Sequence, residues 1–214
     1  MQVLVAGAHG QVGQHVTELL SNSEHDTRGM VRDEEQVEDI EDLGAEAVVA
    51  DLTADVTHAV QGCDAVVFAA GSSGEDVWGV DRDGAINLMG AAEANDAERF
   101  VMLSAMNADA PEESPDELRE YLRAKAEADQ HLRESPLDGT VVRPGALTNE
   151  DGTGEVRVGA DLDRGDGEIP RVDVARTLVA ALPMEHTHGR TFELLSGDEP
   201  IEAALDGLDE TTRD

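Results

Sequence analysis

The single tyrosine and the single lysine of this 214-residue chain lie four residues apart, at Tyr121 and Lys125. On a helix this spacing places both side chains on one face, with their Cβ atoms about 5–6 Å apart. A lysine in that position stabilises tyrosinate, so the phenol can act as an acid near neutral pH. Every other residue in the count of 15 basic side chains is an arginine, which indicates a task for Lys125 that arginine cannot perform. The alternative is an acidic helix that carries both residues on one face without using them.

A second group of residues with chemical potential is the glycine turn near the N-terminus. Val3 to Ala6 are apolar and predict a strand buried on both faces, and the apolar spacing from residue 12 to residue 20 predicts a helix. Between them, the first glycine permits a tight turn, the second lets the backbone approach a pyrophosphate, and the third lets the helix pack closely on the strand. The turn therefore predicts a dinucleotide site; a tight turn in some other α/β protein is the alternative. The expected binding residues are Gly7, His9, Gly10, Gln11, Val12 and Gly13.

The elements that must position these residues alternate between apolar strands and helices. We expect strands at 3–6, 27–31, 47–50, 65–70, 100–103, 140–143 and 191–195, and later helices at 33–43, 55–61, 81–95, 114–135 and 171–182. This order predicts a doubly wound parallel sheet with helices on both faces. We expect one domain over residues 1–205 with a small C-terminal substrate region, and an acidic tail over 206–214. Residues 148–167 are rich in Gly and Asp and predict a mobile segment over the active-site mouth, with a short strand at 156–158.

The composition is strongly acidic, with 48 acidic against 15 basic residues and a formal net charge of −33. The acids are spread along the chain, which predicts a salt-adapted surface, as in a salt-loving organism, and folding that needs screening by salt. Such a surface argues against a nucleic-acid partner and for a monomer or homodimer that binds a small molecule. Cys63 is expected to be a small buried residue, and the histidines show no metal-ligand spacing. Without a membrane span or a leader, the chain is expected to be cytoplasmic.

Five segments carry a resemblance to a known family: Gly7-x-x-Gly10-x-x-Gly13, Asp51-Leu52, Ala69-Ala70-Gly71, Tyr121-x-x-x-Lys125 and Arg143-Pro144-Gly145. Together they resemble the short-chain dehydrogenase/reductases, in the atypical NAD(P)-binding group that is related to the nucleotide-sugar epimerases. The resemblance covers nearly the whole chain and implies a Rossmann fold. It also implies that Asp51 and Leu52 lie on the adenine side, that Ala69, Ala70, Gly71 and Pro144 lie along the cofactor, and that Tyr121 and Lys125 form the catalytic pair.

Two features depart from this family. Its members carry a run of serines after the fifth strand, one of which polarises the substrate carbonyl, whereas this chain has Ser104-Ala105-Met106. Ser104 is therefore a candidate catalytic residue, or a residue that only caps the strand. The C-terminal region is also shorter than the substrate lobe of the nucleotide-sugar epimerases, which favours a small substrate.

The end of the second strand bears on the choice of cofactor. In NAD enzymes an acid about 20 residues after the glycines binds the ribose 2′-hydroxyl. Here Arg32, assisted by Arg28, suits bidentate contacts with a 2′-phosphate. This arrangement favours NADP, and Asp33 leaves NAD as the alternative.

The sequence thus predicts an NAD(P)-dependent oxidoreductase that moves a hydride between nicotinamide and a small carbonyl or alcohol. Tyr121 would be the acid/base, Lys125 would stabilise tyrosinate and hold the ribose, and Ser104 would orient the substrate. The alternatives are a non-catalytic NADPH-binding sensor or scaffold, and a flavin-reductase-like or epimerase-like enzyme. The Tyr–Lys pair favours the first function, and the interrupted serine run favours the others.

Overall fold

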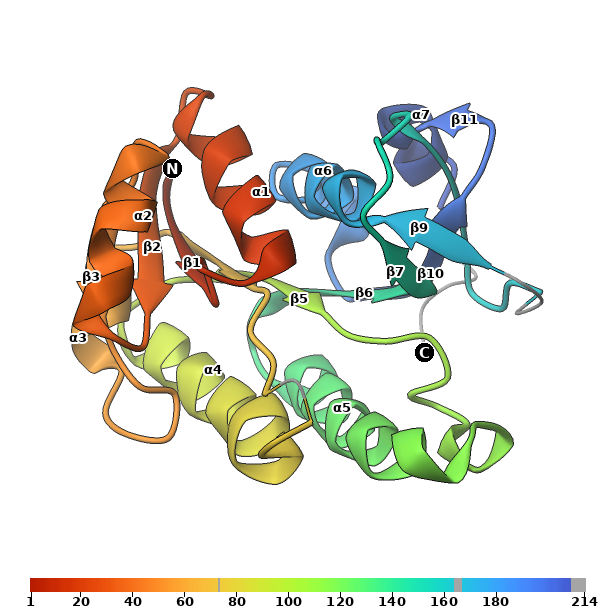
Figure 1. Cartoon of the computed structure of the whole chain (residues 1–214), viewed down its shortest axis with the longest axis horizontal. Coiled ribbons are helices and arrows are strands. Elements are labelled where there is room, and N and C mark those ends of the chain that lie inside the picture. Colours follow the sequence, from red (N-terminus) through yellow and green to blue (C-terminus); the bar gives the residue numbers. More distant parts are fainter. Residues whose placement is uncertain (73, 164–166, 209–214) are drawn as a thin grey trace.

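A nine-stranded, mostly parallel sheet forms the centre of the computed structural model, which describes residues 1–72, 74–163 and 167–208 (Figure 1). The strands of this sheet are β1 (Gln2–Ala6), β2 (Asp26–Val31), β3 (Glu46–Val49), β4 (Ala65–Phe68), β5 (Arg99–Leu103), β6 (Asp138–Pro144), β8 (Glu155–Gly159), β10 (Arg190–Ser196) and β11 (Glu199–Pro200). A separate small sheet pairs β7 (Ala146–Thr148) with β9 (Glu168–Pro170).

The helices are α1 (Gln11–Ser21), α2 (Val37–Asp42), α3 (Thr57–Val60), α4 (Ala85–Ala94), α5 (Asp116–Glu134), α6 (Arg171–Ala181) and α7 (Ile201–Asp206). Four short helical segments join them: η1 (Glu34–Gln36), η2 (Val77–Gly84), η3 (Pro111–Glu113) and η4 (Glu185–Thr187). In the part of the chain that the structure describes, no helix combines the length and apolar character that a membrane span requires.

The strand order confirms the predicted doubly wound sheet. From one edge it runs β3-β2-β1-β4-β5-β6-β10, all parallel, and continues with β8, which is antiparallel to β10 and β11. The chain reverses its direction of winding between β1 and β4. Ligands of open α/β sheets bind outside the carboxyl ends of the strands at such a switch point.

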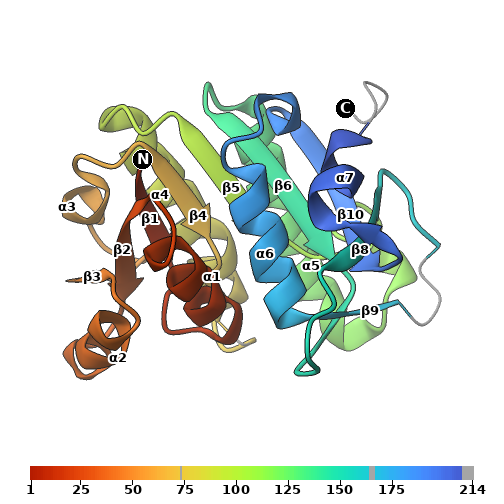
Figure 2. The same cartoon turned by 90° about the horizontal axis from the view of Figure 1, so that it is seen from above.

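Helices cover both faces of the sheet and divide the core in two. On β1, Val3 and Val5 join the cluster under α1 and α6, whereas Leu4 and Ala6 join the cluster under α4 and α5. Figure 1 shows α1 and α6 side by side on one face and α4 and α5 on the other, and Figure 2 shows the same layers from above. Burial of alternate residues on both faces explains why the strands are continuous apolar runs.

One expected strand is present, and two other segments differ from the sequence-based expectation. The short strand expected at 156–158 is β8, which is one residue longer at each end and joins the main sheet by pairing with β10 and β11. The helix expected at 81–95 begins earlier, as the π-helical segment η2. Residues 206–208, expected to belong to an acidic tail, are instead ordered, because Asp206 ends α7 and Leu208 is buried; residues 209–214 lie outside the described part of the chain.

Candidate functional site

The glycine turn lies at the switch point, pressed against the loop that follows β4. Gly7 has a positive φ of 79°, and a Cβ placed there would lie 2.6 Å from Ala70 Cα. A Cβ on Gly13 would overlap the Gly7 carbonyl oxygen, because the first turn of α1 packs directly on the strand. Ala69 continues the sheet by donating its N–H to Ala6 O at 2.9 Å. These approaches leave no room for side chains at residues 7 and 13, as a dinucleotide turn requires.

The N-terminus of α1 is suited to an anion. The N-cap residue is Gly10, which has no side chain to accept hydrogen bonds from the first turn of α1. The N–H groups of Gln11, Val12 and Gly13 therefore have no side-chain cap. The first turn contains no acidic residue, although the whole chain carries 48. Free N–H groups and the positive end of the helix dipole bind phosphate, so this chain's residues fit the pyrophosphate of a dinucleotide.

Arg32 and Asp51 lie near each other beyond the ends of β2 and β3. The Arg32 side chain is 72% exposed and its Nε lies 3.3 Å from Asp33 Oδ2. Hydrogen bonds from the Thr53 N–H and hydroxyl lower the pKa of Asp51, with a smaller contribution from Arg32. Arg28, expected to assist Arg32, instead donates hydrogen bonds to the carbonyls of residues 59 and 61 and to Glu46. Arg28 therefore stabilises the fold at the other end of β2.

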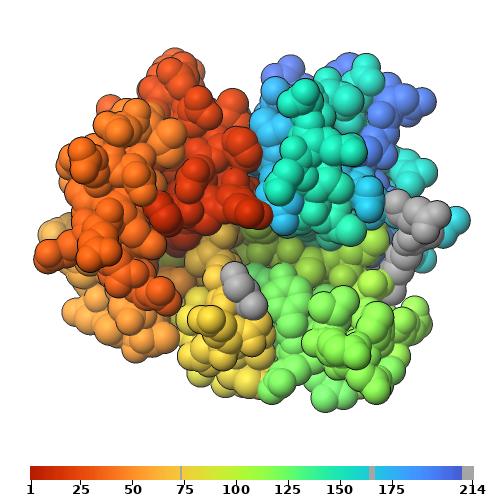
Figure 3. All heavy atoms as spheres, in the orientation of Figure 1, coloured from red at the N-terminus to blue at the C-terminus, as the bar shows by residue number. Residues whose placement is uncertain are grey.

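A groove of about 560 Å³ opens between the loop after β3 and the segment η2–α4. Leu52, Gly79 and Asn87 are among its lining residues, and Asn87 donates hydrogen bonds to the carbonyls of residues 52 and 54. The groove lies on the expected adenine side and is large enough for a small-molecule ligand. Figure 3 shows a hollow on this face of the molecule, between the red N-terminal segments and the yellow and green segments.

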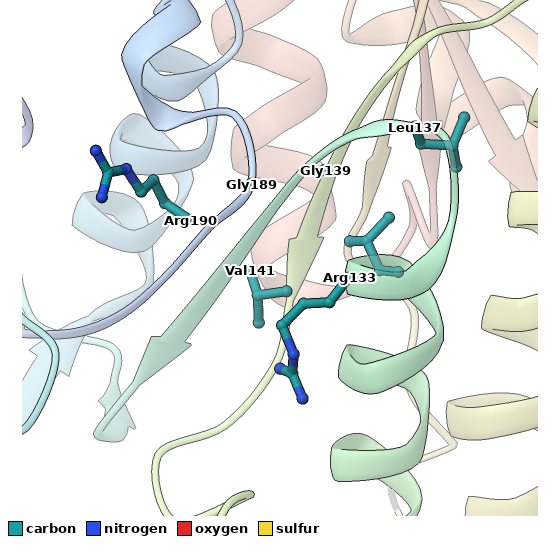
Figure 4. Close-up of a pocket in the computed structure, with 7 residues that line it drawn as sticks. Arg133, Leu137, Gly139, Val141, Gly189 and Arg190 are labelled. Atoms are coloured by element: carbon teal, nitrogen blue, oxygen red, sulfur yellow. The ribbon is translucent and has the colours of Figure 1, made fainter. Parts of the chain in front are cut away.

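A second hollow lies at the opposite, amino end of the sheet, between the end of α5 and the starts of β6 and β10 (Figure 4). Its volume of about 30 Å³ has room for water but not for a metabolite. The carboxyl end of the sheet is therefore the candidate functional site.

Lys125 lies at the centre of this site. Its ammonium is 3.3 Å from Asp81 Oδ1 and donates to the Leu103 carbonyl oxygen, also at 3.3 Å. The same nitrogen lies 5.6 Å from the ring centroid of Phe68 and 5.7 Å from that of Tyr121. The α5 helix thus brings the predicted pair together, at the ends of β4 and β5.

Lys125 is buried as a charged group. Its side chain is 3% exposed and that of Asp81 is 1% exposed. Burial lowers the pKa of Lys125, but Tyr121, Asp81 and Asp129 outweigh burial and raise it above the usual value. Asp81 is held in turn by Ser72, whose N–H and hydroxyl donate to Asp81 Oδ2 at 3.1 and 2.6 Å.

Asp81 is a site residue that the sequence analysis missed. It belongs to η2, where it continues the buried stripe of Ala85 and Leu88. An acid at an apolar position of a predicted helix was the available signal, because a buried acid needs a partner.

Ser104 is turned toward the interior. It is 3% exposed, and its hydroxyl is buried with no hydrogen-bond partner among the described residues. Ser104 lies next to Asp129, whose pKa is raised by burial against the opposing effect of the Arg143 charge. Arg143 Nε donates to Asp129 Oδ2 at 2.9 Å, which ties β6 to α5. Pro144 follows, and its carbonyl accepts the Met106 N–H at 3.0 Å.

Tyr121 is half-buried and borders the site on its outer side. Next to it, Glu120 accepts a hydrogen bond from Trp78 Nε1 at 2.7 Å, and the Arg82 guanidinium stacks 4.6 Å above the Trp78 ring. These contacts fasten η2 to α5. Tyr121, Lys125 and Asp81 are therefore held by two elements that are packed together.

Comparison with known proteins places this geometry in a wider group. Residues 7–185 match the model of a family described as NAD(P)H-binding. The chain is similar to the uncharacterized sugar epimerase YhfK from Bacillus subtilis, at 43% identity over 97% of this chain and 100% of that protein.

Solved structures are similar along almost the whole chain. One, from Bacillus halodurans and named for the NAD-dependent epimerase/dehydratase class, has 41% identity and a TM-score of 0.93, covering 96% of this chain and 99% of the other. The oxidoreductase ylbE from Lactococcus lactis has 31% identity and a TM-score of 0.87, covering 96% and 95%.

Proposed function

The chain belongs to the NAD(P)H-binding family, and from this premise we propose that it is an NADPH-dependent oxidoreductase acting on a small carbonyl compound or the corresponding alcohol. The observation that carries the proposal is the position of Lys125. Its ammonium lies between Asp81, the Leu103 carbonyl and the Tyr121 ring, at the carboxyl ends of β4 and β5. A buried cation held next to a tyrosine at the switch point is an arrangement suited to proton transfer.

Tyr121 is the proton donor in the direction of carbonyl reduction. A reduced nicotinamide, when bound along the glycine turn, would supply the hydride that the carbonyl carbon accepts. Tyr121 protonates the carbonyl oxygen and is left as tyrosinate, which the Lys125 charge stabilises. An ammonium has three N–H groups, of which one is donated to the Leu103 carbonyl and one faces its ion-pair partner Asp81. The third is available to Tyr121 or to a ribose hydroxyl.

The preference for NADPH over NADH rests on the turn after β2. Arg32 is exposed and can meet a 2′-phosphate with charge-assisted hydrogen bonds. Asp33, the residue that would serve a 2′-hydroxyl, is engaged by Arg32 and by the capping of η1. The adenine would lie against Asp51 and Leu52.

The second candidate is a non-catalytic NADPH sensor, and the Ser104 position favours it. The Ser104 hydroxyl is buried, and Ala105, the next residue, has no hydroxyl to polarise a carbonyl. An epimerase-like reaction, after the name of the relative YhfK, would use the same Tyr–Lys pair on an alcohol carbon. The oxidoreductase and the epimerase-like enzyme would both use Tyr121 and Lys125, whereas a sensor does not need them.

The test compares wild type with Tyr121→Phe, Lys125→Met and a matched control, Arg133→Met, on the exposed side of α5. NADPH binding and NADPH oxidation on a panel of carbonyls, sugars and flavins are measured in molar KCl. Tyr121→Phe should lower kcat by about 10²-fold or more and leave NADPH affinity nearly unchanged. Lys125→Met should lower both, and Arg133→Met neither.

A wild type that binds NADPH but turns over no compound of the panel would support the sensor and refute the enzyme. Turnover by Tyr121→Phe at the wild-type rate would remove Tyr121 from the mechanism.

A further inference from the structure

His9 ties together the two turns that follow β1 and β2. It lies between Gly7 and Gly10, whereas its partners Gln36 and Asp39 belong to η1 and α2. His9 Nε2 lies 2.9 Å from Asp39 Oδ2, and His9 Nδ1 lies 3.3 Å from Gln36 Nε2. We call His9, Gln36 and Asp39 the inter-turn latch.

Gln36 fixes the direction of these hydrogen bonds. Its Oε1 accepts the backbone N–H groups of Arg32 and Asp33, both at 3.2 Å. The amide NH₂ therefore faces His9, and because this group only donates, His9 Nδ1 must accept. The ring proton is then on Nε2 and is donated to Asp39. Each hydrogen bond in the latch thus has one donor and one acceptor, and replacing any of the three side chains by one that cannot hydrogen-bond would break the chain of hydrogen bonds.

The latch acts on the backbone from which Arg32 projects. The Arg32 guanidinium is exposed, and Asp33, its ion-pair partner, lies on the same turn. This ion pair does not fix the guanidinium relative to the glycine turn. The distance between the guanidinium and the glycine turn is set instead by the main chain of Arg32. Gln36 holds this main chain, and His9 connects Gln36 to the glycine turn.

We propose that the inter-turn latch determines specificity for a dinucleotide with a phosphorylated ribose. With the pyrophosphate at the N-terminus of α1, His9 and Gln36 hold Arg32 at the distance where a ribose 2′-phosphate lies. They are positioning residues and do not touch the phosphate. A dinucleotide with a free 2′-hydroxyl does not need the guanidinium, so its affinity does not depend on the latch. This role rests on the NADPH-dependent function proposed above.

The experiment measures Kd for NADPH and NADH by calorimetry on the full chain in molar KCl. The variants are His9→Ala, Gln36→Met, Arg32→Ala and the double variant His9→Ala/Arg32→Ala, with His131→Ala on the exposed side of α5 as the control. His9→Ala and Gln36→Met should each weaken NADPH binding about tenfold more than NADH binding, the value of one charge-assisted hydrogen bond. In the Arg32→Ala background, His9→Ala should cause no further loss, because both act through one contact.

Equal losses for NADPH and NADH, additive losses in the double variant, or a wild type without preference for NADPH would each overturn the proposal. Thermal unfolding checks that the variants are folded, and Gln36→Met, at the partly exposed end of the latch, carries the test if His9→Ala does not fold.

The experiment measures dinucleotide binding and needs no turnover. It therefore tests the role of the inter-turn latch in selectivity separately from the oxidoreductase function. Selectivity that depends on the latch in a protein without turnover would refute only the oxidoreductase. Turnover with unchanged selectivity in His9→Ala would refute only the latch.

Discussion

The buried ion pair between Asp81 and Lys125 can be tested by removing its negative charge with Asp81→Asn. At a separation of 3.3 Å and an effective dielectric constant of about 20, the Coulomb attraction is about 5 kcal/mol. Both side chains are at most 3% exposed, so solvent screens the pair little. Breaking a buried pair costs about 3–5 kcal/mol, and we expect about 3 kcal/mol because Asp129 still favours the charged lysine. That corresponds to a Tm lower by roughly 6–12 °C for a chain of this size.

The pH dependence gives a sharper test than the midpoint alone. In wild type the pKa of Lys125 is raised, so its contribution to stability is present at neutral pH and is lost as the pH rises past the raised value. In Asp81→Asn the carboxylate that raises the pKa of Lys125 is gone, whereas the burial that lowers this pKa remains. The pKa of Lys125 should therefore fall below the ordinary value of about 10.4. The folded variant then binds fewer protons than the unfolded chain, and its stability rises with pH in that interval. The difference in unfolding free energy between wild type and Asp81→Asn should therefore be largest near neutral pH and should become smaller toward pH ~10.

Urea unfolding in molar KCl at neutral pH and near pH ~10 measures this gap. Asp83→Asn is the matched control, because Asp83 lies in the same segment η2 but is exposed and pairs with Arg82 at the surface. Its unfolding midpoint should stay close to wild type. An Asp81→Asn protein as stable as wild type, or a gap that does not change with pH, would show that Asp81 does not hold Lys125 in its charged form.

Three further predictions concern the glycine turn, the base of the sheet and the surface charge. Gly13→Ala should abolish NADPH binding by calorimetry, because its Cβ would overlap the Gly7 carbonyl, whereas Gly90→Ala, in open space on α4, should retain binding and stabilise by about 0.5–1 kcal/mol. Arg99→Met should lower the free energy of unfolding in urea by at least about 2 kcal/mol, because the carbonyls of residues 138 and 182 lose the Arg99 donor, whereas that of Ala181 keeps two others. The Tm should rise with KCl at neutral pH, and this gain should shrink as the pH approaches the isoelectric point of about 4.2, where net self-repulsion vanishes.

Most of the parallel sheet could be predicted because its information is local. Strands such as β4 (Ala65–Phe68) are apolar throughout, and glycines or acids mark their ends. Within residues 148–167 the short strand was predicted, but its place in the sheet could not be predicted in this way. β8 (Glu155–Gly159) is short and half polar, and it is held by pairing with β10 and β11, which come more than 30 residues later. Its pairing depends on partners that no local pattern reveals.

The site shows the same division between local and distant information. Gly7, Gly10 and Gly13 were found by spacing within one turn, and Tyr121 and Lys125 by spacing within one helix. Asp81 reaches Lys125 from another element, and the latch joins His9 to Gln36 across 27 residues. Arg28 shows the opposite error: it is four residues from Arg32 in sequence, but its guanidinium bonds to the loop before β4. Proximity in sequence along a strand does not place two side chains at the same end of the sheet.

The contacts of Lys125 explain why a chain that otherwise uses arginine has a lysine at this position. Where a buried cation must satisfy several carbonyls or a carboxylate in one plane, the chain uses arginine, as at Arg99 and Arg143. Lys125 instead meets a carboxylate and a carbonyl from two elements, above the Phe68 ring, and retains a donor for a third partner. A compact ammonium can point its three N–H groups in these divergent directions, whereas a planar guanidinium directs its donors into a single plane. An exposed lysine can be replaced by arginine without loss of these contacts, but the buried lysine at position 125 cannot.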